Sequence, residues 1–199
     1  MGKLLVATTN RAKFNEFVSY LKPHGISVVS LADLSISDNP KEDGETFEEN
    51  SLLKANFYWQ RSGLPTITDD GGLEIDALHG QPGVHSRRID GIDRTDEDLK
   101  CIILERLRGL PDDKRTARLH IVVTLRVSAD QNFQTEASVE GTIKESSLES
   151  EPGFPYRAIL WIPRYTKFYG ECIPEEHAEI NHRKKAIERL LPYLQQYVI

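Results

Sequence analysis

Residues 68–88 read TDDGGLEIDALHGQPGVHSRR, and two adjacent carboxylates, Asp69 and Asp70, stand near their start. We expect this pair at the end of a short strand over residues 64–68, followed directly by two glycines, Gly71 and Gly72. Glycines there let a ligand approach the backbone closely. Acids at a strand end bind a divalent metal or accept a proton from water, although an Asp-Gly turn that merely ends a strand is common.

Strands and helices alternate on either side of this stretch. The sequence predicts further strands over residues 3–7, 26–31, 119–127 and 133–144. It predicts helices from Asn10 to about Leu21, from the N-cap Thr46 to about Arg61, from Thr95, and from about His182, with Pro192 distorting or splitting the last. This order predicts an α/β protein with a mixed sheet flanked by helices.

The composition limits the classes of function. The chain has 199 residues, of which 39% are hydrophobic and 28% charged, as in globular proteins that carry one α/β domain. The formal net charge of -6 argues against a broad surface for nucleic acid, but a local group of Lys and Arg could still bind a small anion. No apolar run has the length of a membrane span, so we expect a cytoplasmic protein with no membrane contact.

The turn Thr8–Lys13 lies between the first strand and the first helix. Backbone N–H groups at a helix N-terminus attract phosphate, and a lysine one turn into the helix adds a positive charge. Taken alone, the turn is better explained by ordinary N-capping, because such caps are frequent.

A second group comprises Glu42 and the predicted helix that follows it. On that helix Asn50 and Lys54 are four residues apart and share a face. A solvated charged face behind a cap would explain Glu48 and Glu49, but it does not explain the apolar Phe47 next to them. Glu42 precedes the helix in a loop and is free to reach a metal.

These groups gain significance from occurring together at the ends of elements, where sites form in open α/β sheets. Lysines and backbone amides can hold phosphates, carboxylates can hold Mg²⁺, and one carboxylate can accept the proton of a water. The combination predicts metal-assisted attack on a polyphosphate.

Five segments resemble the inosine triphosphate pyrophosphatases, which hydrolyse non-standard purine nucleoside triphosphates. ATTNRAKFNEF, EDGETFEENSLLKA and TDDGGLEIDALHGQPGVHSRR are similar to the family's ATGNxxKxxE, ETGxTFxENAxxKA and ADDSGLxVxALxGxPGxYSAR. GFPYRAILWIP and INHRKKA are similar to GFGYDPIFxxP and ISHRxxA. The segments span nearly the whole chain in the family's order.

The resemblance implies one two-lobed domain over residues 1–199, with an elongated mixed β-sheet flanked by helices and a central cleft. It also implies a homodimer that cleaves ITP, XTP and their deoxy forms to the monophosphate and pyrophosphate with Mg²⁺. The nucleoside triphosphate is the expected partner, and nucleic acid is not.

The matching positions carry expected roles. Asp70 would bind the metal with Glu42 and accept the proton, supported by Asp69. The residues expected to hold phosphate are Thr8, Thr9, Asn10, Arg11, Ala12, Lys13 and Lys54. The other expected substrate contacts, most of them to the base, are Gly71, Arg88, Phe154, Pro155, Tyr156, Arg157, His177, His182 and Arg183.

Some positions depart from the family's pattern. Thr9 and Ala12 replace glycines in the phosphate turn, and Gly71 replaces a serine. Arg157 stands where the family has Asp, so a group that only donates hydrogen bonds replaces one that accepts them. Pro155 similarly replaces Gly, and His177 replaces the usual Lys. The changes predict an active enzyme with an altered base preference; the alternative is a nucleotide-binding protein of impaired turnover.

Overall fold

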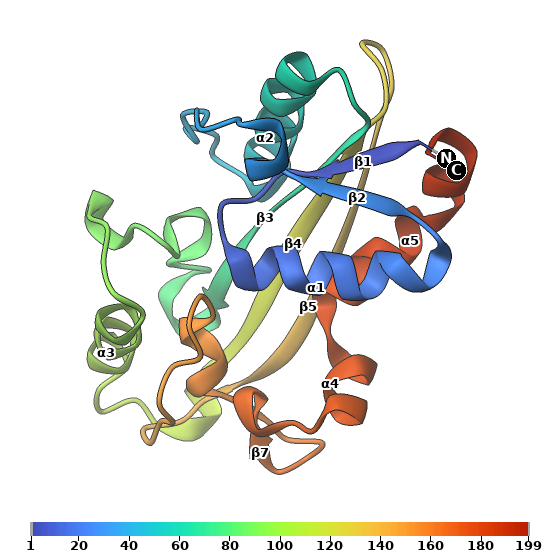
Figure 1. Cartoon of the computed structure of the whole chain (residues 1–199). Helices are drawn as coiled ribbons and strands as arrows, with labels where there is room; N and C mark the ends of the chain where they lie inside the picture. The colour runs from blue at the N-terminus through green and yellow to red at the C-terminus, as the bar shows by residue number, and fades with distance from the viewer. Residues whose placement is uncertain (1, 199) are drawn as a thin grey trace. The chain divides into compact units, whose positions relative to one another are not determined.

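The computed structural model describes residues 2–198 and contains one mixed sheet of seven strands in the order β2-β1-β3-β4-β5-β6-β7 (Figure 1). The strands are β1 Lys3–Val6, β2 Ser27–Ser30, β3 Thr66–Ile75, β4 Thr116–Arg126, β5 Asn132–Ile143, β6 Leu160–Ile162 and β7 Lys167–Phe168. β1 pairs in parallel with β2 and β3, whereas β6 pairs antiparallel with β5 and β7. The predicted α/β class with a mixed sheet is confirmed.

Five α-helices occur in the described part of the chain. They are α1 Arg11–Leu21, α2 Phe47–Ser62, α3 Asp96–Arg106, α4 Pro174–Ile180 and α5 His182–Tyr197. Short 3-10 turns lie at Lys22–His24, Ala32–Leu34, Asp76–Leu78, Gly83–His85, Ile89–Gly91, Asp112–Lys114, Pro155–Ala158 and Tyr169–Glu171. None of the helices among residues 2–198 has the length and apolar character needed to cross a membrane.

The described chain forms two compact units, of which unit 1 comprises residues 2–70, 121–137 and 183–198, and unit 2 comprises residues 71–120 and 138–182. β3, β4 and β5 each supply residues to both units. That the units are two lobes of one domain stays a prediction.

In unit 1, β1 is buried on both faces. Leu4 and Val6 pack with α1 and α5 in one apolar cluster, and Leu5 and Ala7 pack with Tyr58 of α2 in another. Successive side chains of a strand point to opposite faces, so an uninterrupted apolar run belongs to a strand covered on both sides. The chain ends of this unit also meet, since Gly2 N donates to Val198 O at 3.1 Å (Figure 1).

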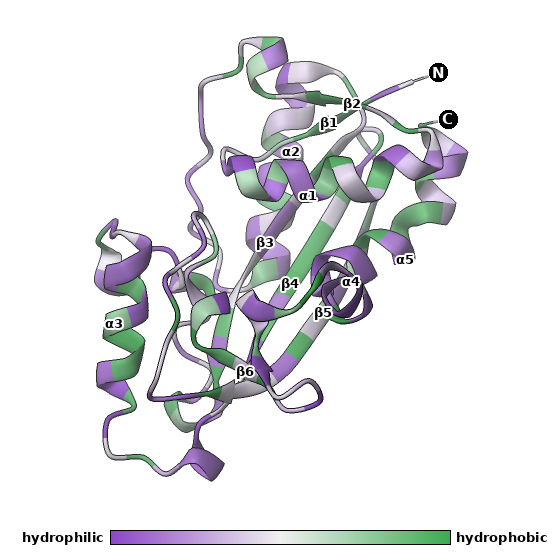
Figure 2. Cartoon of the chain, turned by 60° about the horizontal axis from the view of Figure 1, so that its bottom comes forward, coloured by the Kyte–Doolittle hydropathy of each residue, from purple (hydrophilic) through white to green (hydrophobic). Residues whose placement is uncertain are grey.

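Unit 2 has its own core of apolar side chains from α3, β3, β5 and β6. Leu73 and Ile75 of β3 and Leu99 and Ile103 of α3 are fully buried in it. Figure 2 shows apolar residues alternating with polar ones along α3, as the burial of one helix face requires.

The expected helix boundaries hold at most positions. Thr46 caps α2 by accepting from Glu49 N, and Gly63 ends it with φ of 66°. Thr95 and Asp98 form the expected capping box of α3. The expectation that Pro192 could split the last helix is wrong, because α5 continues through it. Leu190 and Leu194 are fully buried on either side, and their packing offsets the hydrogen bond that proline removes.

The aspartate pair does not end its strand. β3 runs from Thr66 to Ile75, so Asp69 and Asp70 lie inside it. At Gly72 a Cβ atom would lie 2.1 Å from Ser86 Oγ, and Ser86 Oγ accepts from Leu73 N at 2.9 Å. We expected a ligand to approach the backbone closely at these glycines. At Gly72 it is the protein's own Ser86 that does so.

Candidate functional site

Asn10 organises the turn between β1 and α1. Its side-chain oxygen accepts from Ala12 N at 2.9 Å and from Lys13 N at 3.1 Å, and Thr8 Oγ1 accepts from Asn10 N at 3.2 Å. The N-capping interpretation of this turn is therefore confirmed. Arg11 is exposed at the first position of α1, so its cation stands at the helix N-terminus.

Asp69 is buried between two cations. Its Oδ2 accepts from Lys13 Nζ at 2.8 Å and from Arg183 Nη2 at 3.2 Å, and Arg183 also pairs with Glu16. Burial raises the pKa of Asp69, but the charges of Lys13 and Arg183 outweigh it and hold that pKa well below its usual range. Asp69 is therefore an ionised group that fixes Lys13 and Arg183 in place.

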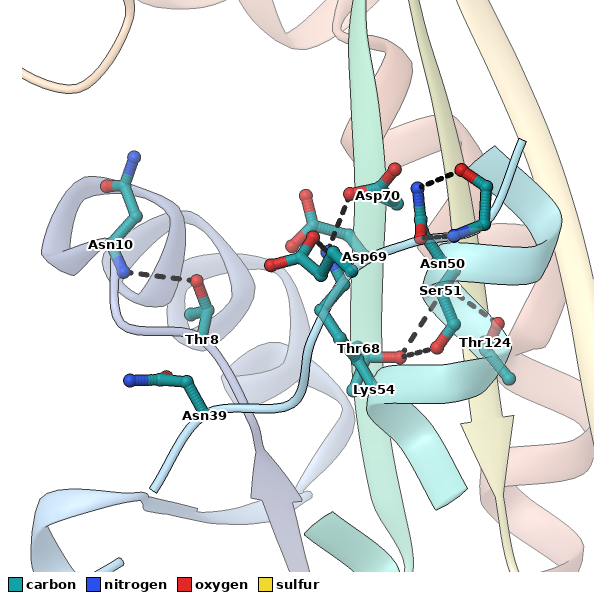
Figure 3. A network of polar contacts seen from close by, with 12 residues as sticks. Thr8, Asn10, Asn39, Asn50, Ser51, Lys54, Thr68, Asp69, Asp70 and Thr124 are labelled. Carbon is teal, nitrogen blue, oxygen red and sulfur yellow. Dashed lines mark hydrogen bonds and ion pairs between the residues drawn. The ribbon is translucent and has the colours of Figure 1, made fainter. Parts of the chain in front are cut away.

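Lys54 of α2 lies between two carboxylates. Its Nζ donates to Asp70 Oδ1 at 2.6 Å and to Glu42 Oε2 at 2.8 Å (Figure 3). Asn50 holds the loop that carries Glu42, because its side-chain amide accepts from Gly44 N at 2.9 Å and donates to Gly44 O at 3.3 Å. Asn50 and Lys54 share a face of α2, so this face contacts both the loop at Gly44 and the carboxylates of Glu42 and Asp70.

Burial and neighbouring charges together set the ionisation of Asp70, Glu42 and Lys54. Burial raises the pKa of Asp70 to about 6 against the opposing charge of Lys54. For Glu42 the charge of Lys54 outweighs burial and lowers the pKa, and for Lys54 the charges of Asp70 and Glu42 outweigh burial and raise the pKa. Near neutral pH, Lys54 is a cation and Asp70 is a carboxylate with an unusually high proton affinity.

The donor set at Glu42 and Asp70 fits Mg²⁺. Both carboxylates reach one point, the Nζ of Lys54, within 2.8 Å, and carboxylate oxygens are the protein ligands that Mg²⁺ prefers. No group of three or more His, Cys, Asp or Glu side chains suited to a metal occurs among residues 2–198. Mg²⁺ requires no such cage, since it commonly uses one or two carboxylates together with waters and substrate phosphates.

Unit 2 holds a second cluster, centred on Tyr169. The guanidinium carbon of Arg157 lies 3.6 Å from the ring centre of Phe154 and 5.2 Å from that of Tyr169, and Arg157 Nη1 is 3.2 Å from Glu151 Oε2. Arg157 is only 5% exposed. Its long side chain is therefore placed by two aromatic rings and one carboxylate.

Two histidines complete this cluster. His177 stacks on Tyr169 with ring centres 4.9 Å apart, and His182 is tilted against the same ring at 6.3 Å. Tyr169 is fully buried and was not among the predicted site residues. An isolated tyrosine between a short strand and a turn gives no periodic signal, so only the fold reveals its position.

The remaining predicted residues have other surroundings. Tyr156 and Pro155 are buried, and the Tyr156 hydroxyl donates to Ser86 O in the core of unit 2, where burial raises the pKa of the phenol. Arg88 is exposed and pairs with Asp93 at 3.1 Å. Arg183, expected at the base, lies in unit 1 against Asp69 and Glu16. Glu16, its partner, was not predicted as a site residue.

Known proteins are similar to this chain in sequence and in fold. The model of the Ham1 family matches residues 4–193. A dITP/XTP pyrophosphatase of Geobacillus kaustophilus is 37% identical over 190 residues, covering 96% of this chain and 93% of that protein. One of Thermus thermophilus is 40% identical over 189 residues, covering 95% and 90%. The structure of a HAM1 protein from Coxiella burnetii has a TM-score of 0.86 and 31% identity, covering 98% of this chain and 100% of that one.

Proposed function

The chain belongs to the Ham1 family, and we propose that it is a nucleoside triphosphate pyrophosphatase that cleaves ITP, XTP and their deoxy forms to the monophosphate and pyrophosphate. The observation that carries this proposal is the position of Lys54 between Glu42 and Asp70, with Asp69 fixed beside them by Lys13. This arrangement combines partly buried cations for phosphate with carboxylates for metal and proton.

Binding of the triphosphate falls to the cations of unit 1 in this proposal. Lys13 and Lys54 neutralise phosphate oxygens, and the turn Thr8–Lys13 presents backbone N–H groups next to them. Asp69 keeps Lys13 oriented through their 2.8 Å ion pair. Glu42 and Asp70 would hold Mg²⁺, which when bound polarises the phosphate oxygens and neutralises their charge.

Asp70 accepts the proton of the attacking water. The water oxygen bonds to the α-phosphorus, the bond from that phosphorus to the bridging oxygen of the β-phosphate breaks, and pyrophosphate leaves. A carboxyl whose pKa burial raises to about 6 is mostly ionised at neutral pH and is a stronger base than an exposed one.

On the family resemblance, we propose that Phe154, Arg157, His177 and His182 recognise the base. The rings offer stacking surfaces, and the guanidinium offers only donors. A donor matches the keto oxygen at position 6, which hypoxanthine and xanthine share with guanine and which adenine lacks. We also propose that the protein is a cytoplasmic homodimer. Light scattering of the purified protein would check the dimer, and the distribution of the protein in the cell would check its location.

A nucleotide panel tests the proposed function. Purified protein with Mg²⁺ is expected to release pyrophosphate from ITP, XTP or dITP faster than from ATP and GTP. Nucleotide-dependent thermal stabilisation without turnover of any panel member would instead select the alternative, a nucleotide-binding protein of impaired activity. If another nucleotide is hydrolysed faster than ITP and XTP, the proposed reaction stands and the proposed base preference is wrong.

Arg157→Asp is expected to change base preference more than rate. The substitution replaces donors by an acceptor and places a carboxylate near Glu151, while Lys54 and Asp70 of unit 1 stay unchanged. We expect the ratio of kcat/KM values for ITP and ATP to shift by about tenfold, as for one lost polar contact. Arg164→Asp is the matched control, since Arg164 is exposed and pairs with Glu179 on the surface. An unchanged substrate ranking in Arg157→Asp would remove Arg157 from base recognition.

A further inference from the structure

Four side chains in unit 1 form a hydrogen-bond network behind Lys54 and the aspartate pair, and three of them are buried while Gln134 is exposed. Thr68 Oγ1 donates to Ser51 O at 2.8 Å, and the Ser51 and Thr124 hydroxyls are 2.7 Å apart (Figure 3). Gln134 Nε2 donates to Thr124 Oγ1 and to Glu48 O, both at 2.9 Å. We call Ser51, Thr68, Thr124 and Gln134 the hydroxyl network; it joins α2 to β3, β4 and β5.

Two bonds of the hydroxyl network have a fixed direction: the Gln134 amide donates to Thr124 Oγ1, and Thr68 Oγ1 donates to the Ser51 carbonyl. The Ser51 hydroxyl lies 2.7 Å from that of Thr124 and 3.5 Å from that of Thr68, and either oxygen of each pair can be the donor. Ser51, Thr68 and Thr124 are at most 1% exposed, so no water competes for these bonds. Bonds in such an environment reinforce one another.

Two members of the hydroxyl network depart from the family motif. Ser51 stands where the family segment ENAxxKA has alanine, and Thr68 stands where ADDSGL has alanine. The Thr68 hydroxyl donates to the backbone carbonyl of Ser51, 17 residues away, and the two hydroxyl oxygens are 3.5 Å apart. These contacts connect β3 to α2.

The position of this connection between α2 and β3 determines which side chains it holds in place. Ser51 is three residues before Lys54 and thus on the same face of α2, and Thr68 directly precedes Asp69 and Asp70 on β3. Moving α2 along β3 would therefore change the 2.6 Å separation of Lys54 Nζ and Asp70 Oδ1. The turn Thr8–Lys13 lies on other elements and meets β3 through the 2.8 Å ion pair of Lys13 with Asp69.

We propose that Thr68 and Ser51 are positioning residues for the reaction: the hydroxyl network holds Lys54 in register with Asp70. This inference rests on the proposed function, because the register matters only if both groups act on a triphosphate. Small misplacements of reacting groups reduce rate strongly, since catalysis depends on orientation. Loss of the network should therefore lower kcat more than it raises KM, since Lys54 also contacts phosphate.

The test is the steady-state hydrolysis of ITP with Mg²⁺ by three variants. Thr68→Val is expected to lower kcat by about tenfold with KM within about threefold of wild type. Thr66→Val is the matched control, because Thr66 is a buried threonine of the same strand whose hydroxyl donates to Leu64 O, also at 2.8 Å. It should lose similar thermal stability and keep its kcat. Thr68→Ser retains the hydroxyl and should keep most of the activity.

The outcomes separate the two claims. Equal kcat values in Thr68→Val and Thr66→Val, or a Thr68→Ser variant as slow as Thr68→Val, would overturn the positioning role while the proposed function stands. An inactive wild-type protein would overturn the proposed function and the inference together. If Thr68→Val does not fold, Ser51→Ala replaces it, with the same expected division between kcat and KM.

Discussion

Asp70→Asn is expected to lower kcat for ITP hydrolysis by about 10³-fold, within the range that loss of a general base produces. The amide neither accepts the proton of water nor binds Mg²⁺ as a carboxylate does, so two contributions are lost at once. Burial gives Asp70 a pKa of about 6, and asparagine has no comparable basicity. Pyrophosphate release under saturating ITP and Mg²⁺ measures the effect.

Asp43→Asn is the matched control for this variant. Asp43 is an exposed carboxylate in the same loop as Glu42, and its partner is the exposed Lys41 at 3.2 Å. It should retain wild-type kcat, and both variants should show the far-ultraviolet circular dichroism of the wild type. Near wild-type turnover by Asp70→Asn would reassign the proton acceptor, with Asp69 as the next candidate.

Asp69→Asn is expected to destabilise the protein by about 3 kcal/mol at pH 7, as breaking a buried ion pair does when it leaves a charge without compensation. Arg183, which is buried, and Lys13 both lose Asp69 as a carboxylate partner in this variant. Denaturant unfolding of both proteins, with matched m-values, measures the difference.

The pH dependence of that difference has a definite sign. Burial alone would raise the pKa of Asp69, but Lys13 and Arg183 lower it below the value of an unfolded chain. The stabilisation is therefore complete above about pH 4, the ordinary range of an aspartate, and is lost as the pH falls further toward the folded-state pKa. The two proteins should thus converge in stability below about pH 4. Asp38→Asn, a change in an exposed pair with Arg61, should have little effect at any pH. A difference that grows on acidification would contradict this account of Asp69.

The local features of unit 1 are predictable from sequence because neighbouring residues produce them. The cap at Thr46, the end of α2 at Gly63 and the Asn10 cap depend on residues within a few positions. The common face of Asn50 and Lys54 follows from helical periodicity in the same way.

Other parts of the site depend on contacts between residues far apart in sequence. β3 continues through the aspartates to Gly72, where Ser86 of a later loop packs against it, and no pattern within residues 64–75 encodes that loop. The ion pair of Arg183 with Asp69 joins positions 114 residues apart. The family motif predicts a contact of Arg183 with the base and gives no sign of this ion pair. The contact of Arg157 with the ring of Tyr169 likewise requires the fold to be known.

The most direct test of the central claim is phosphorus NMR of the products formed from ITP with Mg²⁺. Wild-type protein is expected to give IMP and pyrophosphate in equal amounts, and Asp70→Asn is expected to give neither on the same time scale. Formation of IDP and inorganic phosphate, or nucleotide binding with no turnover, would contradict cleavage between the α- and β-phosphates by the residues assembled around Lys54.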